Sequence, residues 1–321
     1  MEDAAGNMWI GSWNGGLVIV DPEYNLYHFN NYQTNGQLWI SSAETDDTLE
    51  VEPPDSVRHF LSSTVNAPDL LVVNSFLLDE PKNCIWLITL AVRSEKPLVC
   101  YNGTAFSDMA YDSTNWIKND IPDNLGISGA PTAAITKDVF NNLWIGTDRQ
   151  GVLNVQFNND GSVEWFRIDE TDNLKNNSCF ALAGDLDGYV WLGTLNGLNA
   201  YFNGNLFDFR EDYQPIGLVI NDIFVDSENN KWFATNEGVS LLLSRGSPFD
   251  PGSWIHFVPR TSELIRDNLF YTNLPSKEIR AIYVDEATGD VYCSTTSGLA
   301  ILRSNPFTTP LKELSQVKVG P

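Results

Sequence analysis

The sequence has little of what enzyme sites and membrane anchors are built from. Its 321 residues include three histidines, four cysteines and three methionines, and no apolar run approaches the roughly 20 residues that a membrane-spanning helix needs. The histidines, His28, His59 and His256, are isolated from one another. The chain has neither a GxSxG nucleophile elbow nor a glycine-rich phosphate loop before a helix. We therefore expect no enzymatic activity, no cofactor and no membrane span.

Basic residues are also scarce. Lysine and arginine number 19 against 42 aspartates and glutamates, which gives a formal net charge of −23 at pH 7. This balance opposes binding to nucleic acid or to an anionic membrane surface, because both of those partners are negatively charged. Since Asp is a favoured turn residue, we interpret the acidity as that of a soluble, turn-rich surface.

The four cysteines, Cys84, Cys100, Cys179 and Cys293, form no CxxC pair and have no histidine nearby, so they predict no zinc or redox site. Antiparallel pairing of their strands could bring Cys84 and Cys100 together as a cross-strand disulfide. The alternative, which we favour from the sequence, is two small core residues in strand positions. No metal is expected elsewhere: the stretch from Asp185 to Gly188 resembles the start of a calcium loop, but Tyr189 occupies the third ligand position, so we interpret it as a hairpin turn.

A short segment recurs six times along the chain, and a repeat of this kind determines the fold more than any single residue does. In four copies an Asp precedes a Trp by six residues, and in the other two the spacing is seven, to Trp86 and Tyr292. The copies start at Asp3, Asp79, Asp138, Asp185, Asp226 and Asp285.

Each copy predicts a small antiparallel sheet, because an apolar strand leads into an Asp and a tight turn and is followed by two further strands. Both faces of residues 143–147 carry bulky apolar groups, as expected for a sheet stacked between two others. Alternating polar and apolar residues at 25–29, 163–167 and 206–210 predict a fourth, outer strand. The fold class is therefore all-β, a β-propeller of six four-stranded antiparallel blades.

The blades are spaced unevenly. Residues 31–68 separate the first copy from the second, and Trp39 imitates the motif without an apolar strand before it. We expect an extended outer hairpin or loop there, with a seventh blade as the alternative. Only Met1 and Glu2 precede the first Asp, so the first blade is expected to be incomplete at its N-terminus. We assign one propeller domain to residues 1–308.

Candidate binding residues lie in the loops between the second and third strands, because in a propeller these loops open on one face around a central channel. Their side chains differ between copies, whereas the flanking Trp and Gly recur. The bulky Trp13 stands out, because an apolar group at a loop tip is stabilised only when something covers it. The candidate ligand-binding residues are Trp13, Asn14, Arg93, Arg149, Gln150, Asn196, Asn236 and Glu237.

The stretches Asn142–Thr147, Val190–Leu198 and Asn7–Leu17 resemble the two-component regulator propeller repeat. Such propellers occur as periplasmic sensors of hybrid histidine kinases and in PorZ-like proteins of the type IX secretion system. Residues 281–299 are similar to the last blade of PorZ-like proteins, and Leu314–Pro321 resembles the lead into a type IX sorting domain. The resemblance therefore implies that residues 309–321 are a linker into a truncated C-terminal sorting domain. Tyr292 in place of Trp, and residues 87–89 in place of Ile-Gly-Thr, depart from the repeat.

What the resemblance implies is a binding or scaffold propeller in the periplasm or at the cell surface, which assists cargo processing and attachment without chemistry of its own. Its expected partner is a protein of the secretion complex or a glycan such as lipopolysaccharide. The parent protein is then exported, with a signal peptide that this chain does not contain. The alternative is a periplasmic, carbohydrate-sensing propeller of a hybrid two-component regulator.

Overall fold

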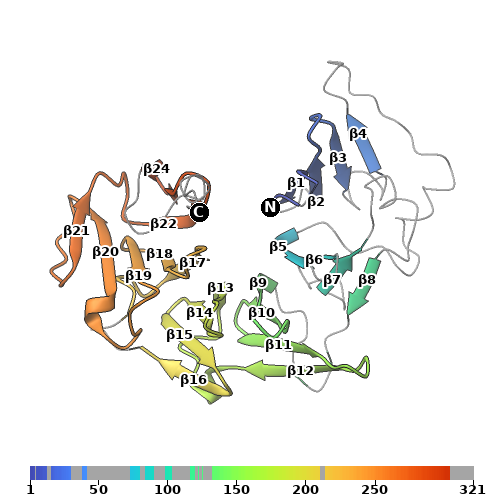
Figure 1. Cartoon of the computed structure of the whole chain (residues 1–321), viewed down its shortest axis with the longest axis horizontal. Helices are drawn as coiled ribbons and strands as arrows, with labels where there is room; N and C mark the ends of the chain where they lie inside the picture. The colour runs from blue at the N-terminus through green and yellow to red at the C-terminus, as the bar shows by residue number, and fades with distance from the viewer. Residues whose placement is uncertain are drawn as a thin grey trace, which may run out of the picture. The chain divides into compact units, whose positions relative to one another are not determined.

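The computed structural model describes residues 1–3, 5–12, 16–29, 38–41, 73–79, 84–89, 98–102, 116–119, 122, 125, 132–209 and 214–303. The chain divides into two compact units, Met1–Ile135 and Thr136–Pro321. Within the described ranges the secondary structure consists of β-strands and two short 3-10 turns, η4 (Glu170–Asp172) and η6 (Pro251–Ser253) (Figure 1). The chain is thus all-β, as its repeats predict.

The first unit contains two sheets of four strands, each in sequential order. The strands of the first sheet are β1 (Met8–Ser12), β2 (Gly16–Val20), β3 (Leu26–Phe29) and β4 (Leu38–Ser41). The strands of the second sheet are β5 (Val73–Asp79), β6 (Cys84–Thr89), β7 (Leu98–Tyr101) and β8 (Trp116–Asn119).

Four further sheets, the third to the sixth, follow in the sequence. The first strand of the third sheet spans the boundary between the units. The strands of the third sheet are β9 (Thr132–Lys137), β10 (Leu143–Thr147), β11 (Val152–Phe157) and β12 (Val163–Ile168). Those of the fourth are β13 (Cys179–Gly184), β14 (Val190–Thr194), β15 (Gly197–Phe202) and β16 (Asn205–Asp208). The fifth contains β17 (Ile220–Val225), β18 (Lys231–Thr235), β19 (Val239–Leu242), β20 (Trp254–Pro259) and β21 (Leu269–Thr272), and the sixth contains β22 (Ile279–Asp285), β23 (Asp290–Thr295) and β24 (Gly298–Leu302).

Two sheets differ from the predicted four antiparallel strands, and a third sheet differs in the strand that carries its recurring aromatic residue. The fifth sheet gains β21, which pairs with β20 in parallel, and the sixth sheet has three strands among the described residues. In the first sheet Trp9 lies on the edge strand β1, whereas the corresponding aromatic residue of every other sheet lies on the second strand. The strand β4 pairs with β3 as an outer hairpin, in agreement with the interpretation of that part of residues 31–68. The rest of that segment, and the predicted domain boundary at 308, lie outside the described residues.

The recurring Asp and Trp are bonded to each other. In the third sheet the indole Nε1 of Trp144 donates to Asp138 Oδ2 at 3.0 Å, and the backbone N–H groups of Phe140 and Asn142 donate to the other carboxylate oxygen at 2.9 Å. The same indole-to-carboxylate bond forms between Trp9 and Asp3, Trp86 and Asp79, Trp191 and Asp185, and Trp232 and Asp226. A hydrogen bond to a carboxylate is stronger than one between neutral groups, so the motif fixes the hairpin turn and the buried indole together.

Neighbouring sheets approach closely at the glycine that follows this Trp by two positions. A Cβ added to Gly146 would collide with the carbonyl oxygen of Cys179, and one added to Gly193 would collide with Ile220. In both cases the obstacle is the first residue of the next sheet, so the absence of a side chain allows consecutive sheets to pack.

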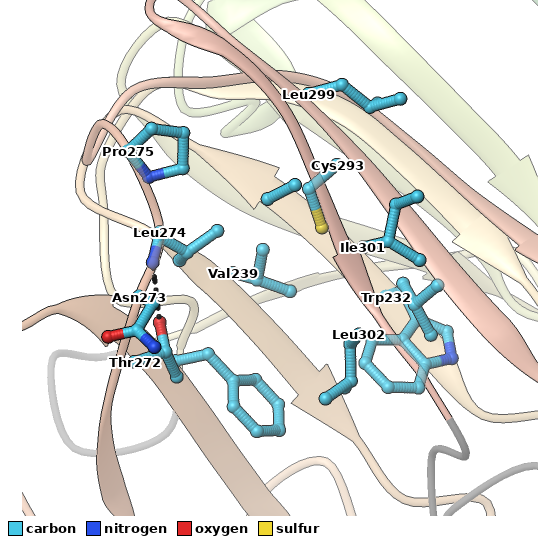
Figure 2. Close-up of a pocket in the computed structure, with 13 residues that line it drawn as sticks. Trp232, Val239, Thr272, Asn273, Leu274, Pro275, Cys293, Leu299, Ile301 and Leu302 are labelled. Carbon is cyan, nitrogen blue, oxygen red and sulfur yellow. Dashed lines mark hydrogen bonds between the residues drawn. The ribbon is translucent and has the colours of Figure 1, made fainter.

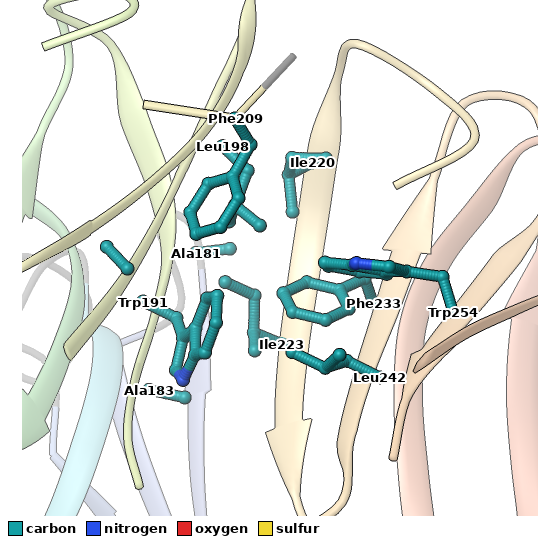
Figure 3. Close-up of a cluster of buried hydrophobic side chains, with 11 residues drawn as sticks. Ala181, Ala183, Trp191, Leu198, Phe209, Ile220, Ile223, Phe233, Leu242 and Trp254 are labelled. Atoms are coloured by element: carbon teal, nitrogen blue, oxygen red, sulfur yellow. The ribbon is translucent and has the colours of Figure 1, made fainter. Parts of the chain in front are cut away.

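The core between the fourth and fifth sheets combines four aromatic rings with aliphatic side chains (Figure 3). Trp191 stacks on Phe209 with ring centroids 5.6 Å apart, and Phe233 approaches Trp191 edge-on at 5.8 Å. Trp254, on the fourth strand of the fifth sheet, contacts both Phe233 and Phe209. Each of these rings loses a large apolar area to the core, which makes this interface a main source of stability.

A buried lysine also joins these two sheets. The Lys231 side chain is 4% exposed, and its Nζ lies 3.1 Å from Asp185 Oδ2 and 3.5 Å from Asp187 Oδ2. Beside it, the backbone N–H of Leu186 donates to Asn229 Oδ1 at 2.9 Å, and Asn229 Nδ2 donates to Asp187 Oδ2 at 2.8 Å. The first turn of the fourth sheet is therefore held by polar side chains of the fifth.

The preference for two unbridged cysteines in the second sheet is wrong, because a disulfide joins Cys84 to Cys100. Cys100 lies opposite Trp86 in the β6–β7 register, so Cys84 is its diagonal neighbour. Their Cα atoms are 6.1 Å apart, a separation that a disulfide can span. Cys179 and Cys293 are free, and burial raises the pKa of each thiol to about 12.

Candidate functional site

The loops between the second and third strands share one hydrogen-bonding device. In the third sheet the Thr147 hydroxyl donates to the Gly151 carbonyl at 2.7 Å and accepts from the Gln150 N–H at 3.2 Å. The hydroxyls of Thr194, Thr235 and Thr295 make the same two bonds in the fourth, fifth and sixth sheets. Because the hydroxyl fixes both ends of the loop, the residues between them can vary without loss of the fold.

The predicted binding residues are distributed unevenly over these loops. Trp13, Asn14 and Arg93 lie outside the described residues. Arg149 points to solvent with 80% of its side chain exposed, beside Asp148, and the Gln150 carbonyl accepts a bond from the Arg167 guanidinium.

Of the described candidates, Asn236 and Glu237 line a common hollow, whereas Arg149, Gln150 and Asn196 are not among its lining residues. The hollow has a volume of about 780 Å³ and lies at the loop end of the fourth, fifth and sixth sheets. Its other lining residues are Phe180, Leu195, Val219, Asn221, Ser276, Lys277, Glu278 and Arg280.

A repeated β-bulge supplies three of these side chains. The register between the first and second strands skips one residue in each of the fourth, fifth and sixth sheets, namely Phe180, Asn221 and Arg280. A bulge frees the extra residue from the ladder and re-aims its side chain, and bulges are frequent beside binding and active sites. Here the same backbone irregularity places an aromatic ring, an amide and a guanidinium at equivalent positions around one hollow.

The charged side chains of the hollow form two exposed ion pairs. Lys277 Nζ donates to both carboxylate oxygens of Glu237 at 2.9 and 3.1 Å, and the Lys277 side chain is 60% exposed. The guanidinium of Arg280 lies 2.7 Å from Glu278 Oε1. An exposed ion pair contributes at most about 1 kcal/mol to stability. Each of these charged groups can therefore release its partner and bind a ligand at a small cost in free energy.

Two asparagine side chains line the hollow, and in each of them one polar atom of the amide is hydrogen-bonded to the backbone. Asn236 Oδ1 accepts from the Val219 N–H at 3.1 Å, and Asn221 Nδ2 donates to the Ile279 carbonyl at 2.7 Å. Among the described residues, Asn236 Nδ2 and Asn221 Oδ1 have no hydrogen-bond partner, so the hollow offers one amide donor and one amide acceptor. Since the two acids and two bases balance, the site suits a polar ligand with both donors and acceptors.

Most residues of this hollow lie outside the second-to-third strand loops, in which the binding residues were expected. In an antiparallel sheet the first strand starts at the end where the second strand finishes, so the connection into each first strand lies beside those loops. The segment Ser276–Arg280, which leads into β22, contributes four lining residues in this way. The sequence does mark these positions. In the first strands of the fourth, fifth and sixth sheets, the residue that follows the first apolar residue is Phe180, Asn221 and Arg280, respectively.

A serine and a histidine also meet in the fifth sheet, away from the hollow. Ser240 Oγ lies 2.9 Å from His256 Nδ1, and the Ile216 N–H donates to the same hydroxyl at 2.8 Å. Ser240 is 0% exposed and His256 is 1% exposed, so a substrate cannot reach the pair. Burial, with a smaller contribution from the positive charge of Arg266, lowers the pKa of His256 to about 3.

The calcium-like stretch is a hairpin turn, as the sequence indicates. Asp185 accepts hydrogen bonds from the N–H groups of Asp187 and Tyr189 and from the Trp191 indole, and its carbonyl accepts from the Gly188 N–H. In the part of the chain that the structure describes, no three His, Cys, Asp or Glu side chains are grouped so as to hold a metal ion.

The fold is similar to solved structures of bacterial extracytoplasmic proteins. PorZ, described as an essential surface component of the type IX secretion system of Porphyromonas gingivalis, aligns over 98% of this chain with a TM-score of 0.60 and 17% identity. The extracellular domains of the hybrid two-component systems BT3049 and BT4673 of B. thetaiotaomicron align over 94% and 95% of the chain, with TM-scores of 0.56 and 0.57 and identities of 19% and 18%. These are propeller proteins, so the resemblance to both groups extends from the repeat to the fold.

The chain spans about two fifths of the length of these proteins, since the alignments cover 40%, 38% and 37% of them. No family model matches the sequence, and a search of curated proteins finds no match. Within the described ranges, no helix has the length and apolarity that crossing a membrane requires.

Proposed function

We propose that this chain is a non-enzymatic binding propeller of an exported protein, and that the hollow at the loop end of the fourth to sixth sheets holds its partner. The observation that carries the proposal is the repeated bulge, which directs Phe180, Asn221 and Arg280 to one hollow. The bulge itself belongs to the fold, because it recurs at Asn74 in the second sheet. What supports recognition is that the bulged residues of the fourth, fifth and sixth sheets differ chemically and line one hollow.

Two observations support a role in binding without chemistry. The hydroxyl of Ser276, which lines the hollow, lies 2.8 Å from Thr296 Oγ1 and accepts from the Glu278 N–H, so its contacts include no general base. The Ser240–His256 pair is closed to solvent, and its histidine is neutral at physiological pH.

Export is supported by the Cys84–Cys100 disulfide, because disulfides persist mainly in oxidising compartments outside the cytoplasm. Together with the similarity to PorZ, this favours a PorZ-like component that assists cargo processing and attachment at the cell surface. The second candidate is a periplasmic carbohydrate-sensing propeller, which the similarity to the two hybrid-system extracellular domains supports.

Calorimetric titration with two probes tests the proposal. We expect the chain to bind either purified lipopolysaccharide, in agreement with the secretion role, or one of a panel of neutral oligosaccharides, in agreement with the sensor role. In either case Glu237→Gln and Lys277→Gln should weaken binding at least tenfold. The matched control Glu263→Gln replaces an exposed glutamate that does not line the hollow and should leave binding unchanged. Binding of a probe that all three variants retain would place the site elsewhere.

A further inference from the structure

The hairpin turns between first and second strands lie at the opposite end of the sheets from the hollow. In the third to sixth sheets these turns are residues 138–142, 185–189, 226–230 and 285–289. In the fourth to sixth sheets the first strand leads from the hollow to its turn, so the two ends are roughly 20 Å apart. We call the four turns together the turn face.

Neighbouring turns of the turn face contact one another. A Cβ added to Gly188 would lie 3.5 Å from Val139 Cγ2, so the turn of the third sheet touches that of the fourth. The bond from the Leu186 N–H to the Asn229 side chain joins the turns of the fourth and fifth sheets. The N–H and hydroxyl of Ser227 donate to the two carboxylate oxygens of Glu286 at 2.7 and 2.5 Å, which joins the turns of the fifth and sixth sheets. The turn face is therefore one continuous surface.

Three large apolar side chains are exposed on this surface. Phe140 is 73% exposed, Leu186 is 69% exposed and Val139 is 47% exposed. The half-buried ring of Phe202 lies beside Val139, because both have an atom 3.5 Å from a Cβ added to Gly188. Exposed apolar groups that adjoin one another are typical of an interaction site, whereas single ones scattered over a surface are not.

The hairpin turn itself does not require an apolar residue at its tip. Phe140 contributes only its backbone N–H to the turn, as a donor to the Asp138 carboxylate. The equivalent bond in the other three sheets is made by Asp187, Glu228 and Ala287. Because acidic and small residues form the same turn, the Phe140 ring needs an explanation other than local structure.

Elsewhere in the second unit, many large apolar side chains lie between the sheets. Figure 2 shows Trp232 and Val239 of the fifth sheet near Cys293 and Leu302 of the sixth, around a pocket that both sheets line. The apolar side chains of the turn face are open to solvent instead. Burial against a partner would remove them from water, which is favourable in proportion to the apolar area covered.

The turn face is also acidic, which limits the kind of partner that it can bind. The nearest bases along the chain are Lys137 and Lys231, and Lys231 is buried and paired with Asp185 and Asp187. The four turns contain no basic residue and seven acidic ones, namely Asp138, Asp185, Asp187, Asp226, Glu228, Asp285 and Glu286. This charge opposes nucleic acid, an anionic membrane and the same face of a second copy, whereas it attracts a cationic partner.

We propose that the turn face binds a segment of a protein partner in which apolar side chains alternate with lysine or arginine. The apolar side chains pack on Phe140, Leu186 and Val139, and the cationic groups meet the exposed carboxylates of Asp187 and Glu228. Since this surface is separate from the hollow, the proposal does not depend on what the hollow binds.

Fluorescence anisotropy of a labelled peptide, titrated with the full chain, tests the proposal. The peptide is synthetic, and its leucines and lysines recur so that a helix carries them on opposite faces. Phe140→Ser and Leu186→Ser should each weaken binding about tenfold, because each removes an apolar anchor. Glu228→Lys should also weaken binding, because it brings like charges together. The matched control Ile265→Ser replaces a side chain that is 97% exposed and lies outside the turns, and Lys277→Gln alters the hollow; both should leave binding unchanged.

A second peptide separates recognition from general attraction to a negatively charged chain. It has the same composition in scrambled order, so it presents no apolar face and should bind about tenfold more weakly. Equal binding of the two peptides, no binding of either, or unchanged affinity in Phe140→Ser and Leu186→Ser would overturn the proposal. Sedimentation of the chain alone provides a further test. Self-association that Phe140→Ser abolishes would assign the turn face to a second copy, and that result would refute the proposal too.

Discussion

His256 should make the stability of this protein sensitive to mild acid. The side chain lies on β20, is 1% exposed and has its Nδ1 atom 2.9 Å from Ser240 Oγ. Burial in this site, together with the positive charge of Arg266, lowers its pKa from 6.5 to about 3. The folded protein therefore keeps the imidazole neutral between pH 3 and pH 6.5, whereas the unfolded chain binds a proton there.

The sign and size of the effect follow from this difference. Because the unfolded state binds more protons in this window, the contribution of His256 is fully present above pH 6.5 and is lost as the pH falls toward 3. The loss is about 1.4 kcal/mol per pH unit, so by pH 5 it amounts to roughly 2 kcal/mol. At pH 5 the size of this loss depends only on the pKa of His256 in the unfolded state, because the imidazole of the folded protein is still neutral at that pH.

The assay must separate His256 from the 42 acidic residues, which also titrate on acidification. His256→Gln retains a polar side chain next to Ser240 but cannot be protonated. Urea denaturation at pH 8 and pH 5 should therefore give a loss of unfolding free energy that is about 2 kcal/mol greater in the wild type than in the variant. Equal losses in both proteins would refute the reasoning. So would an NMR titration in which the ring proton resonance of His256 shifts with a midpoint near 6.5.

Three further predictions concern stability. Lys231→Met should lower the free energy of unfolding by about 3 kcal/mol in urea denaturation, because it leaves a buried carboxylate without its cation, whereas Lys277→Met should cost less than about 1 kcal/mol. Gly146→Ala should lower the melting temperature, by the equivalent of about 1–3 kcal/mol, because the new methyl group meets the backbone of the next sheet; Gly252→Ala, where there is room, serves as the control. Burial raises the pKa of Asp222, so the folded state holds its proton more tightly than the unfolded state; stability should rise as the pH falls toward 3.8, and Asp222→Asn should abolish that part of the pH dependence.

Much of the fold could be predicted from the sequence because its determinants are local. The strand of residues 143–147 follows from a run of apolar residues between turn signals, and the outer strand at 163–168 follows from alternation. The parallel strand β21 could not be predicted, since nothing in residues 269–272 specifies pairing with β20 in that direction. The Cys84–Cys100 disulfide depends on the β6–β7 register, which sequence alone leaves open.

The candidate site was predictable in part, for a related reason. Asn236 and Glu237 are in the hollow because repeat symmetry places their loop at the end of the sheet. Lys277 lies in the connection into the sixth sheet and Arg280 lies on the first strand of that sheet, so whether they line the same hollow as that loop depends on how the sheets pack. The same holds for Lys231, whose carboxylate partner Asp185 is 46 residues away in the sequence and lies on the neighbouring sheet.

The repeated residues of this chain bond to one another, and this separates the residues that stabilise the fold from those that line the hollow. Asp138 and Trp144 are partners in one motif, and Thr147 and Gly151 are partners in the loop. None of the recurring Asp, Trp, Thr and Gly residues is among the lining residues of the hollow. Selection on the fold therefore leaves the lining positions free to differ from copy to copy, as Phe180, Asn221 and Arg280 do at one structurally equivalent site. Because three equivalent positions present an aromatic, an amide and a cationic group, the hollow lacks the symmetry of the repeat and is suited to a ligand that is itself asymmetric.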